Sequence, residues 1–254
     1  MVVLDHYRGI SLMSIAGKVW AKILNRRLEE YIDPMISKQQ FGFRKERGTR
    51  NAIFTVRRLV EMARCKEDLN LHLLFIDFKK AYDSIIRENL WLILELYGVP
   101  SEFIQKLKDL HEEVKIKVKV HGKIGREFFS FRGLRQGCVL APLLFNIAID
   151  FVIKKVGYLL PSAGAVIHRR NPGIFGKGST HRKIIDSENT ALYADDMTLL
   201  SHKLAEIQQL VDLLITCAQE VGLSISTEKS KLFSIINVEE TVTQIKVGTF
   251  LLKR

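Results

Sequence analysis

Cysteine and proline are scarce in this chain, which has three cysteines and five prolines among 254 residues. Cys65, Cys138 and Cys217 are scattered and form no CxxC pair, so the sequence predicts neither a disulfide framework nor a zinc site. Unpaired thiols are typical of reducing compartments, and we therefore expect an intracellular protein. The amino-terminal stretch agrees, because charged residues interrupt any signal-peptide core.

Long hydrophobic runs are also missing. The longest apolar stretch, residues 138–153, contains Pro142, Asn146 and Asp150, and it is too short and too polar to span a bilayer. We therefore expect no membrane anchor and no membrane partner.

Acidic residues are outnumbered, with 28 Asp and Glu against 39 Lys and Arg, which gives a net charge of +11. An excess of this size favours a polyanionic partner, most often nucleic acid and less often an anionic membrane surface. A merely soluble, basic protein is the less favoured alternative. With 47% hydrophobic residues, the chain can bury the core of one large domain or of two small ones.

Apolar residues recur at helical spacing in some segments and form continuous or alternating runs in others. The helical pattern predicts helices over residues 14–31, 87–97, 101–113, 142 onward and 204–221. The extended pattern predicts strands over residues 71–78, 191–193, 197–200, 223–226 and 231–236. Residues 161–190, with several glycines and arginines, are predicted to be a long basic loop.

Strict alternation distinguishes Val114–Val120, where Lys115, Lys117 and Lys119 share one face and apolar residues share the other. The turn HGKIG and the returning run EFFSF complete a predicted β-hairpin. Its lysines are solvated, protect an edge strand, or contact nucleic acid, and the pattern does not decide among these roles.

The segment 44–58 is strongly basic, with a single acid, Glu46. Its basic residues are Arg44, Lys45, Arg47, Arg50, Arg57 and Arg58. One interpretation is a solvated helix face. Because Phe41, Phe43 and two glycines lie beside these charges, the other interpretation is a loop that holds phosphate groups.

Two adjacent acids, Asp195 and Asp196, interrupt the apolar run ALYADDMTLL. Buried carboxylates are unfavourable without a compensating cation, and this run contains no lysine or arginine. A divalent metal ion is one compensating cation, and a solvent-exposed Asp-Asp turn is the alternative. Because neighbouring side chains on a strand point to opposite faces, both acids reach one site only at the bend of a hairpin.

Asp77 makes the metal interpretation stronger, because it ends another apolar strand, LHLLFID. If the two strands are neighbours, three carboxylates converge. Carboxylates that hold two Mg²⁺ ions are the usual device for in-line nucleotidyl transfer, and the basic charge then fits a nucleic acid that is being extended.

Six motifs in a fixed order resemble the reverse transcriptase domain of non-LTR (LINE-type) retrotransposons. They are YRGISL (7–12), QFGFRKERGT (40–49), FIDFKKAYD (75–83), GLRQGCVLAPLLFN (133–146), LYADD (192–196) and GLSISTEKSK (222–231). The YADD motif alone is weak, but FIDFKKAYD, RQGCVLAPLLFN and LYADD in that order make the resemblance specific, because each matches over many positions.

The resemblance implies an α+β, right-hand polymerase fold with fingers and a palm, in which helices back an antiparallel sheet. It places the fingers mainly in residues 1–70 and the palm mainly in residues 71–240, which also contribute fingers segments, with residues 161–190 as a basic loop insertion. The thumb, the Tyr-Leu-Gly-type segment that supports the primer end, and the upstream endonuclease domain of the family have no counterpart in this sequence. Residues 241–254 therefore read as a truncated tail, and we expect a part of a larger retrotransposon polyprotein.

The resemblance also implies site residues. Asp77, Asp195 and Asp196 match the family's metal-binding acids, which hold two Mg²⁺, with Mn²⁺ as a substitute. Residues matched to nucleotide binding are Phe78 through its backbone, Tyr82 as the steric gate against a 2′-hydroxyl, Arg44, Lys45, Gln136 and Gly137. Lys229 matches a lysine near the pyrophosphate, where it would act as a general acid. For Tyr82 and Lys229, core packing and a solvated turn are the alternatives.

The implied activity is RNA-directed DNA synthesis, with an RNA template, a DNA primer or target, and dNTPs as partners, and with the nucleus as the place of action. An inactive, truncated remnant that only binds nucleic acid is the main alternative. A nucleotide cyclase on a related palm is disfavoured, because a cyclase has no use for the basic QFGFRK and RQG segments.

Overall fold

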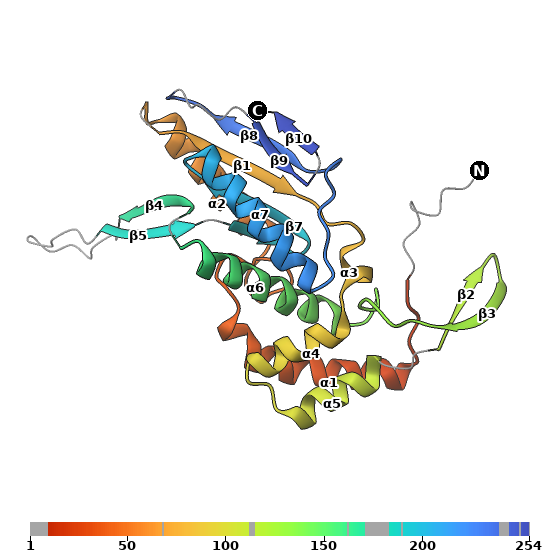
Figure 1. The fold of residues 1–254 in the computed structure, drawn as a ribbon. Coiled ribbons are helices and arrows are strands. Elements are labelled where there is room, and N and C mark those ends of the chain that lie inside the picture. The colour runs from red at the N-terminus through yellow and green to blue at the C-terminus, as the bar shows by residue number, and fades with distance from the viewer. Residues whose placement is uncertain are drawn as a thin grey trace, which may run out of the picture. The chain divides into compact units, whose positions relative to one another are not determined.

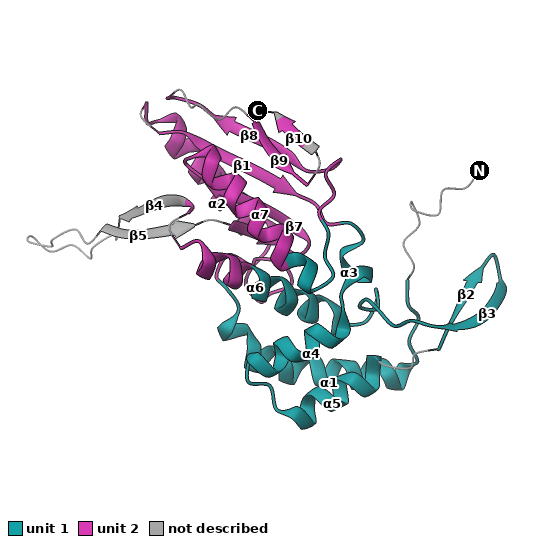
Figure 2. Cartoon of the chain, in the orientation of Figure 1, with its two compact units in different colours: residues 1–37, 79–152, 218–224 teal, residues 38–78, 153–217, 225–254 magenta. Residues whose placement is uncertain are grey.

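The computed structural model describes residues 10–67, 69–111, 115–161, 163–170, 183–188, 190–238, 244–248 and 250–253. The chain divides into two compact units (Figure 2). The first comprises residues 1–37, 79–152 and 218–224, and the second comprises residues 38–78, 153–217 and 225–254. Part of the YRGISL motif, residues 7–9, lies outside the described residues.

The second unit is built on a four-stranded antiparallel sheet with the order β6-β7-β1-β8. Its strands are β6 (Thr190–Tyr193), β7 (Asp196–Ser201), β1 (Leu71–Ile76) and β8 (Lys231–Ile235). Helix α2 (Thr49–Arg64) contacts β6, β1 and β8, and helix α7 (Leu204–Glu220) also lies along the sheet (Figure 1). This arrangement is the antiparallel sheet backed by helices that the resemblance implies.

One face of this sheet is covered by apolar side chains along part of its length, and Asp77 lies beyond the end of that cover. Leu71 and Leu73 of β1 share a buried cluster with Leu59 and Ala63 of α2 and with Leu200 of β7. Side chains two residues apart point to the same face, so this face continues along β1 through Phe75 to Asp77. Phe75 is 42% exposed, which shows that the apolar cover ends before Asp77 is reached.

The first unit is mainly helical. It contains α1 (Ile15–Ile32), the 3₁₀ turn η2 (Asp33–Met35), α3 (Ala81–Ser84), α4 (Arg87–Leu96), α5 (Ser101–His111) and the part of α6 (Ala141–Leu159) up to residue 152. Ser14 caps α1 by accepting a hydrogen bond from Gly17 N at 3.1 Å, and Pro34 follows the helix end. Within the described residues, no helix is long and apolar enough to cross a membrane.

A buried arginine organises the chain that leads to the RQG loop. Arg87 is 4% exposed, and its guanidinium donates to the carbonyls of His111, Ser130, Arg132 and Gly133 at 2.7–3.0 Å. Carbonyl oxygens thus satisfy a charge that would otherwise be costly to bury.

The predicted hairpin exists as β2 (Lys115–Val120) and β3 (Lys123–Phe129), with a register shift between Lys117 and Lys119. Residue 114 lies outside the described part. Both faces are largely exposed, and Lys115 and Lys117 each form an ion pair with Glu127, at 3.3 and 3.4 Å. Their charges are therefore partly matched within the hairpin rather than simply solvated.

Three regions differ from the sequence-based expectation. Residues 161–190 are not one loop, because β4 (Ala165–Arg170) and β5 (Lys183–Glu188) pair in antiparallel register; residues 171–182 lie outside the described part. In the carboxyl-terminal tail, β9 (Gln244–Val247) and β10 (Phe250–Lys253) pair in the same way. Residues 223–226 form no strand and make only a bridge from Ile225 to Phe78.

Candidate active site

Asp77 follows directly after the buried strand β1 and is held by the loop after residue 225. Its carbonyl accepts a hydrogen bond from Ser226 N at 2.7 Å, and Ser230 Oγ lies 3.5 Å from Asp77 N. Ser230 Oγ in turn donates to the Ser226 carbonyl at 2.7 Å. The backbone at Asp77 is therefore fixed on the side opposite β7.

Lys229 extends from the same loop toward Asp77, with its Nζ 3.5 Å from Asp77 Oδ2. The lysine side chain is 68% exposed and the Asp77 side chain 29%. The exposure makes this ion pair weak. Asp77 Oδ2 is shielded from solvent and has no hydrogen-bond donor among the described residues.

Asp195 and Asp196 occupy the predicted hairpin bend. Tyr193 of β6 pairs with Asp196 of β7, so Ala194 and Asp195 form a two-residue turn. Ala194 has a φ of 57°, a left-handed conformation that costs a non-glycine residue about 1 kcal/mol. Such strain is frequent at functional sites and persists only where the surroundings enforce it.

The sheet register brings Asp77 and Asp196 together. Ile76 pairs with Met197, so the next position along the same register sets Asp77 opposite Asp196, on the same face. Burial raises the pKa of Asp196, and the charges of Asp195 and Asp77 raise it further. The three acids are therefore close enough to repel one another, in agreement with the strand register.

A divalent cation fits this donor set, because the acids are mutually repelling oxygen ligands and the shielded Asp77 Oδ2 has no hydrogen bond and only a weak ion pair with the exposed Lys229. As the side chains stand in the described residues, no three His, Cys, Asp or Glu side chains already form a closed metal cage. Binding would therefore require the carboxylates to close around the ion.

The segment before the basic loop holds the turn from the other side. Phe41 N donates to the Leu192 carbonyl at 2.9 Å, and Leu192 N donates to the Gln39 carbonyl at 3.0 Å. The buried Gln40 Oε1 accepts from Gly42 N at 2.9 Å and from Ala194 N at 3.3 Å. Sequence patterns gave no sign of this role, because only the fold shows that Gln40 is buried beside the turn.

The basic segment contains both structures that the sequence left open. Arg44, Lys45 and Arg47 lie in a loop, whereas Arg50, Arg57 and Arg58 belong to helix α2. Arg57 and Arg58 form ion pairs with Glu61 on the exposed helix face. The Arg44 Nη1 donates to the Gln40 carbonyl at 3.3 Å, and Lys45 is exposed.

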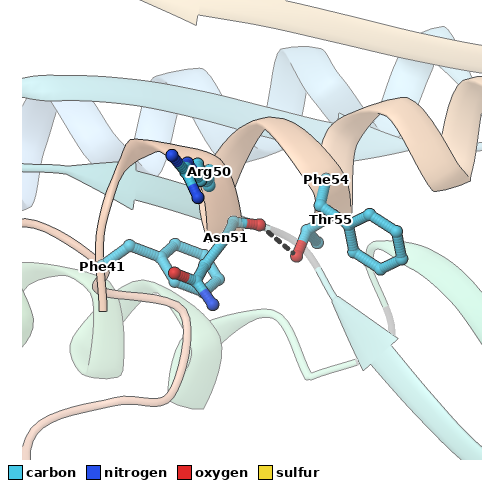
Figure 3. A pocket seen from close by; sticks show the side chains of 5 residues that line it. All are labelled: Phe41, Arg50, Asn51, Phe54 and Thr55. Atoms are coloured by element: carbon cyan, nitrogen blue, oxygen red, sulfur yellow. Dashed lines mark hydrogen bonds between the residues drawn. The ribbon is translucent and has the colours of Figure 1, made fainter. Parts of the chain in front are cut away.

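A shallow pocket of about 370 Å³ lies where this loop meets helix α2 (Figure 3). It is lined by Phe41, Arg50, Asn51, Phe54 and Thr55. Thr55 Oγ1 donates to the Asn51 carbonyl at 3.0 Å, as the dashed line in Figure 3 shows. The pocket combines two aromatic rings with one guanidinium. Phe41 and Arg50 belong to the segment for which a phosphate-holding loop was one interpretation, whereas the other three residues were not named from the sequence.

Of the remaining predicted residues, Phe78 belongs to the second unit, where it is buried and bridges Ile225, and Tyr82, Gln136 and Gly137 belong to the first. The Tyr82 ring stacks on Phe145, with ring centroids 4.7 Å apart, so part of the ring packs in the core as the alternative interpretation held. Gln136 O accepts a hydrogen bond from Ser11 N at 2.7 Å. Gly137 has a φ of 101°, and a Cβ there would lie 2.9 Å from Ser11 O, so only glycine fits this loop.

Comparison with known proteins gives the chain a family. A family model described as reverse transcriptase (RNA-dependent DNA polymerase) matches residues 4–248. The chain is 28% identical over 226 residues to the Pol polyprotein of the type-2 retrotransposable element R2DM of Drosophila melanogaster. The aligned region covers 88% of this chain and 19% of the relative. It is 32% identical over 145 residues to the RNA-directed DNA polymerase of the mobile element jockey of Drosophila funebris. This aligned region covers 56% of this chain and 16% of the relative.

A solved structure shares the fold. The apo telomerase of Candida tropicalis superposes with a TM-score of 0.58 at 12% identity, over 93% of this chain and 45% of the telomerase chain. This similarity confirms the right-hand polymerase fold, and the retrotransposon relatives confirm the resemblance stated above. The chain therefore belongs to the reverse transcriptase (RNA-dependent DNA polymerase) family.

Proposed function

We propose that this chain is the polymerase domain of a non-LTR retrotransposon and adds dNTPs to a primer 3′-hydroxyl on an RNA template. The observation that carries the proposal is the convergence of Asp77, Asp195 and Asp196 at one edge of the sheet. The chain spans only 19% and 16% of the two relatives described above, so the larger polyprotein and its action in the nucleus belong to the same proposal.

The three acids would hold two Mg²⁺ ions, and Mn²⁺ as a substitute. When bound, the metal supplies activation of the 3′-hydroxyl and neutralisation of charge on the triphosphate. The acids' part is to present oxygens to the ions, and the register that sets Asp77 opposite Asp196 supports this role, with the carboxylates closing around the ion on binding.

Lys229 fits a role on the leaving-group side. Its ammonium lies 3.5 Å from Asp77 Oδ2 and is mostly exposed, so the group can turn toward a phosphate at little cost. There it would neutralise developing charge and donate a proton to pyrophosphate. The ion pair with Asp77 partly compensates the acids until the substrates bind.

The other predicted residues would shape the nucleotide site. Phe78 would contribute its backbone next to Asp77, and Tyr82 would exclude a 2′-hydroxyl. Arg44 and Lys45 would approach the triphosphate, whereas Gln136 and Gly137 would line the nascent base pair. The net charge of +11 supports nucleic-acid substrates, here an RNA template and a DNA primer or target.

Single-nucleotide extension of a DNA primer on an RNA template with Mg²⁺ tests this function. Wild type should incorporate a dNTP, and Asp195→Asn should lose incorporation while still binding template–primer. Asp109→Asn, an exposed acid on α5, is the matched control and should behave as wild type. Extension by Asp195→Asn at the wild-type rate would overturn the assignment, and no extension by wild type that binds template–primer would favour an inactive remnant. No observation in the structure favours the remnant.

A further inference from the structure

Residues 39–42 extend the catalytic sheet at its edge. Gln40 forms a parallel β-bridge with Leu192 of the edge strand β6. Two backbone hydrogen bonds make this bridge, from Leu192 N to the Gln39 carbonyl and from Phe41 N to the Leu192 carbonyl. This segment and the turn that follows β6 are 154 residues apart in the sequence, yet they are in direct contact.

The side chain of Gln40 reaches the catalytic turn itself. It is 0% exposed, and its Oε1 accepts from Ala194 N at 3.3 Å as well as from Gly42 N at 2.9 Å. Ala194 is the residue with positive φ, directly before Asp195. The amide therefore supports the one strained residue of the turn, at the position where an L residue needs external support.

Gly42 permits this close approach. A Cβ at residue 42 would lie 2.3 Å from Ala194 N and 3.0 Å from Ala194 Cα. The two backbones are thus so near that no side chain fits between them, and Gln40 can bridge them with one oxygen.

The carbonyl of Gln40 joins the same residue to the basic loop. It accepts hydrogen bonds from Arg44 Nη1 at 3.3 Å and from Arg47 Nη1 at 3.4 Å. One residue thus contacts the catalytic turn through its side chain and the basic loop through its backbone.

We propose that Gln40 is a positioning residue for the catalytic turn, holding Ala194 so that Asp195 and Asp196 face Asp77. In this role Gln40 touches neither the metal nor the nucleotide, and it acts through the Ala194 amide. The inference rests on the proposed function for its effect on catalysis, but the hold on the turn is a separate claim that can be measured without activity.

Gln40→Met keeps the length and shape of the side chain and removes the acceptor, and Gln39→Met makes the same change one residue away, at a half-buried side chain. Hydrogen exchange of the peptide containing residues 190–198 gives the first readout. Gln40→Met should speed exchange there about 10-fold or more, whereas Gln39→Met should leave it unchanged. Gln40→Asn, whose amide is one methylene too short, is the second variant if Gln40→Met fails to fold, and it should act in the same direction.

Primer extension gives the second readout. Gln40→Met should lower kcat about 10- to 100-fold and raise the Mg²⁺ concentration for half-maximal rate, as loss of a group that orients metal ligands does. The KM for template–primer should stay near that of wild type, because the Gln40 carbonyl and its two arginine bonds remain. A residue that matters only for stability would lower the active fraction without changing the Mg²⁺ dependence.

The two readouts separate the two claims. Unchanged exchange and unchanged Mg²⁺ dependence in a folded Gln40 variant would overturn the positioning role. Faster exchange in a protein whose wild type extends no primer would uphold the hold on the turn and contradict the proposed function instead.

Discussion

Asp150 and Asp77 lie in different surroundings, and the difference distinguishes a structural aspartate from a candidate catalytic one. Asp150 in α6 is 0% exposed, and its carboxylate accepts from Ser37 N at 2.8 Å and from Tyr97 Oη at 2.5 Å. Asp77 is more exposed, and its shielded Oδ2 accepts no hydrogen bond from the described residues and has only the exposed Lys229 ammonium, 3.5 Å away, as a weak partner. Buried polar groups are normally satisfied, so the hydrogen-bonded Asp150 fits a structural role and the weakly paired Asp77 fits a ligand-binding role.

The electrostatics follow the same division. Burial and the neighbouring Asp150 carboxylate raise the pKa of Tyr97, so Tyr97 remains a hydrogen-bond donor at any working pH. At the sheet edge, burial and two like charges raise the pKa of Asp196. Two hydrogen bonds thus compensate the Asp150 carboxylate, whereas the three acids are compensated only in part, by the exposed Lys229 ammonium.

The largest expected effect comes from Asp77→Asn. It should reduce primer extension by about 10⁴-fold, as loss of a central catalytic group does, because it removes one acid of the metal-binding set. The same change removes a like-charge interaction, so the free energy of unfolding in urea should stay equal or rise. Strong destabilisation with intact extension would reverse the comparison and make Asp77 the structural acid.

Asp150→Ala should give the opposite pattern. It leaves the Ser37 N–H and the Tyr97 hydroxyl without their acceptor and should lower the free energy of unfolding by about 3 kcal/mol. Urea unfolding measures the loss, and Asp212→Ala, an exposed acid on α7, is the matched control. Primer extension per folded molecule should stay near that of wild type. A large loss of extension would contradict the purely structural role of Asp150.

The buried His111 makes the free energy of unfolding depend on pH. Burial, together with the charges of Arg135 and Arg87, lowers the pKa of His111 to about 4, despite a hydrogen bond to the Leu107 carbonyl. The unfolded chain binds a proton below about pH 6.5 and the folded chain does not. Stability from this group is therefore complete above pH 6.5 and falls by up to about 3 kcal/mol as the pH falls toward 4. Urea unfolding of wild type and His111→Gln between pH 7 and 4 measures it, and equal slopes for the two proteins would contradict it.

Lys229→Met should have the smallest effect of the set. Loss of a general acid typically lowers the rate about 100-fold, and binding of template–primer should change little, because one exposed charge is removed. Pre-steady-state extension measures the rate, with Lys231→Met in β8 as the control. Equal extension rates for Lys229→Met and Lys231→Met would contradict the general-acid role and favour the alternative that Lys229 is a solvated turn lysine.

Local pattern predicted much of this molecule, and contacts distant in sequence were predicted less well. β1 is a near-continuous apolar run and α1 has helical spacing of apolar residues, so their bounds followed from the sequence within a few residues. The Asp195-Asp196 bend followed as well, because adjacent acids reach one site only in a hairpin. Pairing of β4 with β5 was missed, because glycines and arginines surround short strands whose partner lies beyond a long connection.

The hold of Gln40 on Ala194 was missed for the same physical reason. A glutamine beside phenylalanine and glycine gives no periodic signal, and its burial depends on a turn far along the chain. The roles of Tyr82, Gln136 and Gly137 came only from the resemblance. The structure adds local reasons for their places, such as the ring of Phe145 beneath Tyr82.

Mn²⁺ binding tests the central claim most directly. Electron paramagnetic resonance titration would compare wild type, Asp77→Asn and Asp150→Asn, each with template–primer that ends in a dideoxynucleotide and with the next dNTP. The account predicts tight Mn²⁺ binding by wild type and Asp150→Asn, and at least about 10-fold weaker binding by Asp77→Asn. Equal binding by all three proteins would contradict it, because the weakly paired Asp77 would then be no metal ligand.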